Sequence, residues 1–196
     1  MNFLHPIAAL CIALSVSLPA LAQRPLDDTL NDPTVLRGLA QIDATRDLSA
    51  QRLVRIGGII SPSGEELERA QAVAGLMREI GLQDVQITAS PNAIGRIPGS
   101  SGKSIVFVAT LDDLATVAEH QRAADSLPII EGDRVVGPGT NTSLTTIAIA
   151  GGTLSIAISS ERGGQRGFAD EWADIEVMQR TAKNVFLTAV TQANAN

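Results

Sequence analysis

A run of apolar residues near the middle of the chain, residues 105–109 (IVFVA), constrains the fold more than any other feature. An uninterrupted apolar run is typical of a strand that is buried on both faces of its sheet, whereas a strand with one wet face alternates apolar and polar residues. Residues 104–109 are therefore predicted to form a strand with helices packed on both sides. This arrangement predicts an α/β fold with a layered sheet and flanking helices.

Helical patterns before and after this run supply the flanking helices. Apolar residues recur at helical spacing over residues 65–80, and Gly81 follows where a glycine commonly ends a helix. A longer helical pattern is predicted to break near Asp47, and Asp47 or Ser49 can cap its second half. The other predicted helices cover residues 35–60 (with this break), 113–126 and about 174–191.

Short strands and turns complete the pattern. The remaining strands are predicted at residues 85–88, 93–97 and 154–159. The first two are separated by a turn at residues 90–92, and the sequence EGD at residues 131–133 indicates a hairpin turn. Residues 145–150 fit a helix and a strand equally well.

The first 22 residues are interpreted as a secretory signal peptide. An apolar run over residues 7–18 is followed by small residues at Ala20 and Ala22, which fit cleavage after Ala22. The run is shorter than the roughly 20 residues that a membrane-spanning helix needs. No Lys or Arg precedes it, so an uncleaved anchor is the alternative. With cleavage, we expect a periplasmic or secreted protein that does not associate with membranes.

The mature chain would then hold a polar linker, residues 23–34, and one domain, residues 35–196, long enough to bury a core. The single cysteine, Cys11, lies in the expected signal peptide, so disulfides, thiolate ligands and a cysteine nucleophile are excluded. A net charge of −6 with 3% aromatic residues argues against nucleic-acid binding. The one histidine left, His120, is interpreted as a surface residue.

Four stretches of the sequence, taken in order, carry a family pattern. They are SPSGEELERAQAVAGLMREIGL (residues 61–82), GKSIVFVATLDDL (102–114), GDRVVGPGTN (132–141) and TLSIAISSERGGQRGFADEWADIEVMQRTAKNVFLTAV (153–190). Together they resemble the catalytic domain of zinc-dependent exopeptidases, the superfamily of the aminoacylase, peptidase T and carboxypeptidase type. The resemblance covers roughly residues 49–142 and 153–190. It implies a truncated zinc-exopeptidase-like catalytic domain without the smaller domain that many relatives use to dimerise.

The resemblance also implies where metal ligands would stand. In the family, a His-x-Asp motif ends a strand; its histidine binds zinc and its aspartate orients that histidine. Here the histidine position is Thr110, while the supporting carboxylate is kept as Asp112. The bridging carboxylate of the second motif falls on Thr142, and the last histidine ligand falls on Phe168. The paired glutamates of the family lie in a stretch that this chain does not contain.

These replacements remove the donors that a hydrolytic zinc site needs, because such a site uses imidazole and carboxylate ligands around an open position. Threonine is a weak neutral donor, and phenylalanine has no lone pair. A site reduced to Asp112, Asp113 and Glu161 could hold only a hard cation such as calcium, and weakly. In the plainer interpretation, Asp112 and Asp113 cap the following helix. We expect no catalytic residue and no cofactor where the family has zinc, which makes the chain a pseudoenzyme.

A glycine-rich stretch, residues 163–167, is the candidate for substrate binding. The backbone N–H groups around Gly164 and the guanidinium of Arg166 can receive the carboxylate of a small peptide or an acyl-amino acid. The plainer interpretation is a flexible connector.

Two other functions stay open. The first is an active metallo-hydrolase with atypical ligands, which would use Asp112, Glu161 or Glu171, or ligands from a partner chain. The second is a non-catalytic interaction protein that binds a full-length relative. The sequence does not indicate the oligomeric state.

Overall fold

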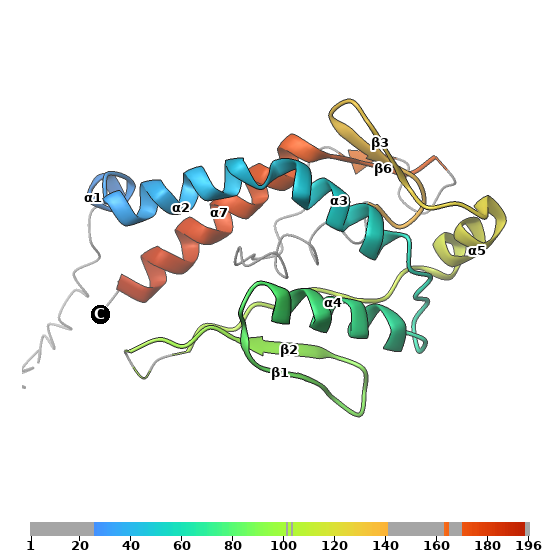
Figure 1. The fold of residues 1–196 in the computed structure, drawn as a ribbon, viewed down its shortest axis with the longest axis horizontal. Helices are drawn as coiled ribbons and strands as arrows, with labels where there is room; N and C mark the ends of the chain where they lie inside the picture. The colour runs from blue at the N-terminus through green and yellow to red at the C-terminus, as the bar shows by residue number, and fades with distance from the viewer. Residues whose placement is uncertain (1–25, 101, 103, 141–162, 165–169, 195–196) are drawn as a thin grey trace, which may run out of the picture.

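The computed structural model describes residues 26–100, 102, 104–140, 163–164 and 170–194. The helices are α1 (Leu26–Leu30), α2 (Pro33–Ala44), α3 (Arg46–Gly57), α4 (Leu67–Glu79), α5 (Ala115–Ala124) and α7 (Ile175–Asn194). The strands are β1 (Gln83–Ile87), β2 (Ala93–Arg96), β3 (Ile129–Glu131), β4 (Arg134–Val136), β5 (Gly163–Gly164) and β6 (Trp172–Asp174). This mixture of helices and short strands confirms the α/β class at a coarse level (Figure 1). None of the described helices combines the length and apolar character needed to cross a bilayer.

Helices α2 and α7 lie side by side in the upper half of the molecule (Figure 1). The Asp32 carboxylate accepts a hydrogen bond from the N–H of Thr34 at 2.8 Å, which caps α2 at its start. Gly38 of α2 lies so close to the ring of Phe186 on α7 that a Cβ at this position would overlap the ring. The glycine therefore sets how closely the two helices approach.

The amino-terminal part of the described chain differs from two expectations. Residues 26–30 of the expected linker form α1, which packs on α2 and α7 and buries Thr29. The helical pattern over residues 35–60 divides into α2 and α3 at Thr45, close to the expected break. The expected cap is wrong, because Thr45 and not Asp47 or Ser49 stands at the start of α3, and no side chain caps it.

The segment from α4 to β2 agrees with its sequence pattern. α4 packs against the antiparallel hairpin of β1 and β2. Gly81 has a φ of 87°, and the N–H groups of Gly81 and Leu82 donate to the carbonyls of Arg78 and Met77. This pair of bonds is the Schellman arrangement, in which a glycine in the left-handed region ends the helix. The predicted helix, its stop and the following hairpin are confirmed.

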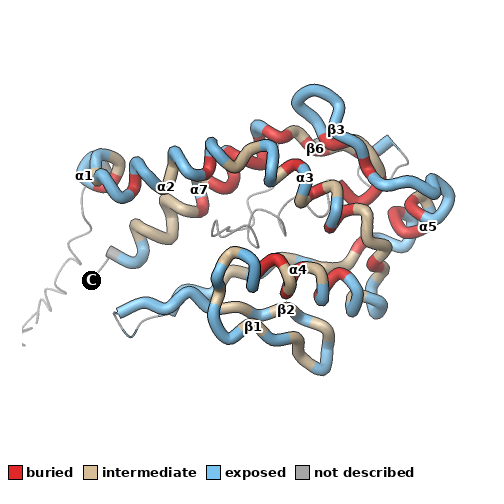
Figure 2. Tube along the Cα trace, viewed as in Figure 1, coloured by how far each residue is buried: buried red, intermediate tan, exposed pale blue. Residues whose placement is uncertain are grey.

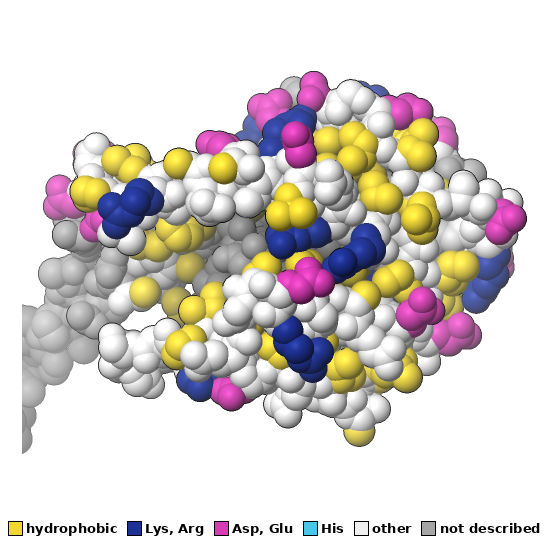
Figure 3. All heavy atoms as spheres, viewed as in Figure 1, with side chains coloured by type: hydrophobic (Ala, Val, Ile, Leu, Met, Phe, Trp, Pro, Cys, Tyr) yellow, Lys and Arg dark blue, Asp and Glu magenta, His cyan; other side chains and the backbone are white. Residues whose placement is uncertain are grey.

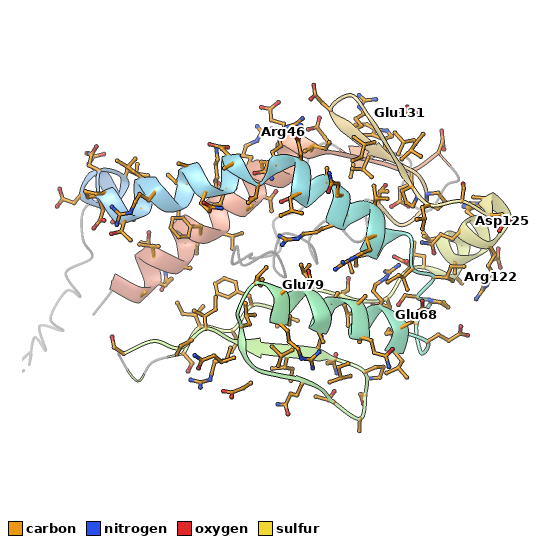
Figure 4. All side chains as sticks on the ribbon, in the orientation of Figure 1. Arg46, Glu68, Glu79, Arg122, Asp125 and Glu131 are labelled. Atoms are coloured by element: carbon orange, nitrogen blue, oxygen red, sulfur yellow. The ribbon has the colours of Figure 1, made fainter. Side chains whose placement is uncertain are left out.

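The second sheet joins distant parts of the chain in the strand order β3-β4-β6-β5, with all its neighbours antiparallel. β3 and β4 form the hairpin predicted from residues 131–133. Arg46, at the start of α3, lies beside this hairpin (Figure 4), and its guanidinium pairs with Asp133 at 2.6 Å. β6 leads directly into α7, which confirms the predicted closing helix.

The hydrophobic core lies where α3, α4, α7 and the second sheet face one another (Figure 2). Its buried members are Ala50, Leu53, Ile56, Val73, Leu76, Met77, Val135, Ala173, Ile175 and Met178. The surface is mixed: on the face drawn in Figure 3, basic side chains are interspersed with acidic and hydrophobic ones. The described residues on that face form no continuous basic patch.

The prediction of a buried strand at residues 104–109 is wrong. This segment belongs to neither described sheet, and Val106 and Val108 are 80% and 75% exposed. Within the described part of the chain, no backbone hydrogen bond joins it to a neighbouring strand. An uninterrupted apolar run favours a strand, but strand formation and burial both depend on partners that a local pattern does not reveal. The predicted elements at 145–150 and 154–159 lie outside the described residues.

Candidate functional site

Three segments are joined around the end of α3: the loop 58–66 bonds to residues 111–114, and residues 137–140 approach Gly57. The N–H of Asp113 donates to the carbonyl of Ser61 at 2.7 Å, and the Ser61 hydroxyl donates to the carbonyl of Leu111 at 3.0 Å. These bonds join the loop after α3 to the loop before α5. We call the polar groups enclosed by these loops the loop-junction cluster: Ser61, Arg69, Asp113, Gln121, Thr140 and Glu171, all buried.

A buried ion pair lies at the centre of this cluster. The Arg69 guanidinium contacts the Asp113 carboxylate, and the two side chains are 1% and 0% exposed. The same guanidinium donates to the carbonyl of Leu111 at 2.9 Å and to that of Ile59. Arg69 thus satisfies backbone acceptors from two loops as well as a carboxylate. Its planar fork of donors suits this task better than a lysine ammonium would.

The environment of Asp113 disfavours its charge. Burial raises the pKa of the Asp113 carboxyl; the hydrogen bond and charge of Arg69 lower it, and the negative charges of Glu171 and Asp112 raise it further. The net direction is upward from the ordinary value of 3.8. Asp113 Oδ1 and Arg69 Nε are buried without a hydrogen-bond partner among the described residues. The buried ion pair therefore leaves one polar atom of each side chain without a hydrogen-bond partner among the described residues.

This pKa shift predicts a pH dependence of stability. Because the pKa of Asp113 is raised on folding, the folded chain binds more protons here than the unfolded chain. The contribution of Asp113 to the free energy of unfolding is therefore largest below pH 3.8 and falls as the pH rises through the raised pKa. Urea titrations measure the free energy of unfolding of the wild type and of Asp113→Asn. The wild-type value minus the variant value should decrease as the pH rises. A difference that grows with pH would mean that Arg69 lowers the pKa of Asp113 by more than burial raises it.

Asp112, the expected supporting carboxylate, points to a different neighbour. Its Oδ2 accepts a hydrogen bond from the Ser63 hydroxyl at 2.6 Å. The interpretation of Asp112 and Asp113 as helix caps is wrong, since Leu114 stands at the N-terminus of α5 and no side chain caps it. Both residues instead hold the loop after α3: Asp112 through its carboxylate and Ser63, and Asp113 through its backbone N–H and through Arg69.

The second motif, residues 137–140, joins the same junction. The N–H of Gly137 donates to the carbonyl of Glu171 at 2.7 Å, which fixes the loop to the segment before β6. Gln121 of α5 donates through Nε2 to the carbonyls of Gly57 at 2.7 Å and Pro138 at 3.3 Å. The glycine-rich turn predicted here therefore has a structural role: it lets three backbone segments approach one another.

Among the described residues, the donors near the expected ligand positions do not gather into a hydrolytic zinc centre. Thr110 is exposed, Asp112 and Asp113 are engaged as described, and His120 lies half-buried on α5. In the part of the chain that the structure describes, no three His, Cys, Asp or Glu side chains gather closely enough to hold a metal.

Other predicted site residues are placed only in part. Gly164 is in β5, where it pairs with Trp172 of β6, and the guanidinium of Arg134 lies 4.0 Å from the centre of the Trp172 ring. The positions of Thr142, Glu161, Arg166 and Phe168 lie outside the described residues. The predicted carboxylate-binding stretch is thus described only at Gly163 and Gly164.

Sequence reasoning missed Arg69 and Gln121. A signal for Arg69 was present, because it lies four residues before Val73 and seven before Leu76, on the apolar face of α4. A charged residue on an apolar face indicates a buried partner. Gln121 has no such signal, since its acceptors are backbone carbonyls from other parts of the chain.

Comparison with models of known protein families and with curated protein sequences finds no match to this chain.

Proposed function

We propose that this chain is an exported, non-catalytic protein resembling zinc-dependent exopeptidases, in which carboxylates near the former metal position stabilise loops. The observation that supports this is the pairing of Asp113 with Arg69 and of Asp112 with Ser63. A carboxylate that already binds a guanidinium in the interior must break that pair before it can bind a metal. Breaking a buried pair is costly, so recruitment of Asp113 as a ligand is disfavoured.

The residue type at position 110 also argues against hydrolysis. Thr110 stands where the resemblance expects an imidazole, and a neutral hydroxyl does not lower the pKa of bound water as a zinc–imidazole site does. The function that we propose for this chain is therefore to bind a small ligand and not to hydrolyse it. We assign the binding of the carboxylate of a small peptide or acyl-amino acid to the backbone N–H groups near Gly164 and the guanidinium of Arg166.

Zinc titration and an amide-hydrolysis assay test this proposal. Isothermal titration of the full chain with micromolar zinc chloride should show no saturable binding, whereas structural zinc sites bind more tightly than this. N-acetyl amino acids and dipeptides, with zinc added, should be hydrolysed no faster than in the protein-free blank, while an intact zinc exopeptidase serves as the positive control. Zinc-dependent hydrolysis that Asp112→Asn abolishes would overturn the proposal and establish a metallo-hydrolase with atypical ligands.

A further inference from the structure

The apolar segment 105–109 has no strand partner in the part of the chain that the structure describes. It carries no charged residue and, among the described residues, belongs to neither sheet and has no backbone hydrogen bond to a strand. Val106 and Val108 are its most exposed side chains, while Phe107 and Ala109 between and after them are partly covered. This alternation is that of a strand with one face against the body of the molecule and the other open. Exposed strand edges of this kind are templates for pairing with another chain.

The order of residues makes this edge complementary to itself. Two antiparallel copies centred on Phe107 would place Val106 opposite Val108, Ile105 opposite Ala109 and Phe107 opposite Phe107. Each pair joins apolar side chains on the same face, which is the favourable cross-strand arrangement. No charge enters the paired region, although each copy carries a net charge of −6.

The residues beyond the segment favour the antiparallel direction. In the sequence, the basic Lys103 precedes the segment and the acidic Asp112 follows it. Antiparallel pairing brings the basic end of one copy to the acidic end of the other, whereas parallel pairing brings like charges together. Complementary charge at the ends of an interface sets its orientation and register more than its strength.

We propose that residues 105–109 form a two-stranded antiparallel seam with the same residues of a second copy, with the two-fold axis at Phe107. The same surface is used by both copies, so the association closes as a dimer. The seam is short compared with stable interfaces, which bury about 1,200–2,000 Å², so the dimer should form in a concentration-dependent way. This proposal does not depend on whether the chain binds zinc.

Sedimentation velocity of the full chain, over about a hundredfold range of protein concentration, tests association; the range brackets the weak affinity expected of a short interface. The weight-average mass should rise toward twice the monomer value. A mass that stays at the monomer value at the highest concentration would overturn the proposal, since another segment of the same chain would then cover the edge.

Two double variants test the register. Val106→Glu with Val108→Glu places glutamate opposite glutamate twice in the proposed seam, so this variant should be monomeric at every concentration. Val106→Lys with Val108→Glu places the introduced lysine of one copy opposite the introduced glutamate of the other, so it should still dimerise. Both variants change only exposed positions and should keep the wild-type circular dichroism and melting behaviour.

The variants separate this seam from other associations. Dimers in both double variants would locate the interface elsewhere, and monomers in both would exclude the antiparallel register. Either result overturns the proposal. As an independent measurement, Phe107→Cys in a Cys11→Ser background should form a disulfide-linked dimer under mild oxidation, because the two positions face each other across the axis. Failure to cross-link while the wild type dimerises would contradict the position of the axis.

Discussion

Replacement of Arg69 by methionine is expected to lower the free energy of unfolding by about 3–5 kcal/mol, the range for removing one partner of a buried ion pair. Methionine keeps much of the side-chain volume, so the loss is chiefly polar. The Asp113 carboxylate would stay buried without its cation, and the carbonyls of Ile59 and Leu111 would lose their donor. Equilibrium unfolding in urea, followed by circular dichroism, measures the change.

A matched control shows that burial is the cause. Arg55→Met makes the same chemical change on the surface of α3, where the guanidinium lies 3.8 Å from Glu79 and both side chains are more than half exposed. Exposed pairs of this kind contribute about 0–1 kcal/mol, so this variant should unfold close to the wild type. Equal losses in the two variants would contradict the structural role assigned to Arg69.

The double replacement Arg69→Met with Asp113→Leu separates the charge from the backbone contacts. It removes the buried charge together with its partner, so the double variant should be more stable than Arg69→Met alone. Recovery should be incomplete, because the carbonyls of Ile59 and Leu111 still lack the donors that Arg69 supplied. If the double variant were less stable than the single one, the carboxylate would not be the source of the loss.

The parts of the fold that depend on neighbours in the sequence could be predicted from it. Helix α4 with its stop at Gly81, the hairpin of β3 and β4, and helix α7 follow from periodicity and turn residues. The failure at residues 104–109 has a different origin. Composition indicates that a segment prefers an extended conformation, but whether a sheet receives it depends on chain segments far away.

In the candidate site, too, local features could be predicted from the sequence, and contacts between distant residues could not. Residue types at Thr110 and Asp112 could be assessed from the sequence, because the presence or absence of a donor is a local property. The use of Asp113 could not, since it depends on Arg69, 44 residues earlier in the chain. The capping interpretation failed because both side chains have other partners: Asp113 pairs with a buried guanidinium, and Asp112 accepts a hydrogen bond from Ser63.

The loop-junction cluster also depends on close contact between Gly139, in the 137–140 segment, and Gly57 at the end of α3. Gly139 has a φ of 88°, and a Cβ placed there would lie 2.5 Å from the carbonyl oxygen of Gly57 and 2.6 Å from Nε2 of Gln121. Gln121 donates from that same atom to Gly57. The position therefore excludes a side chain twice, through its backbone conformation and through lack of space.

Gly139→Ala is accordingly expected to reduce the free energy of unfolding by about 1–2 kcal/mol for the left-handed backbone. Overpacking should add about 1–3 kcal/mol. Gly64→Ala is the matched control, because Gly64 has a similar φ of 95° but nothing within 4 Å of the added carbon, so only the backbone term applies. The difference between the two variants in urea unfolding measures the contact between the loops. Equal losses would mean that Gly139 and Gly57 separate easily, and that this contact adds little to the stability of the junction.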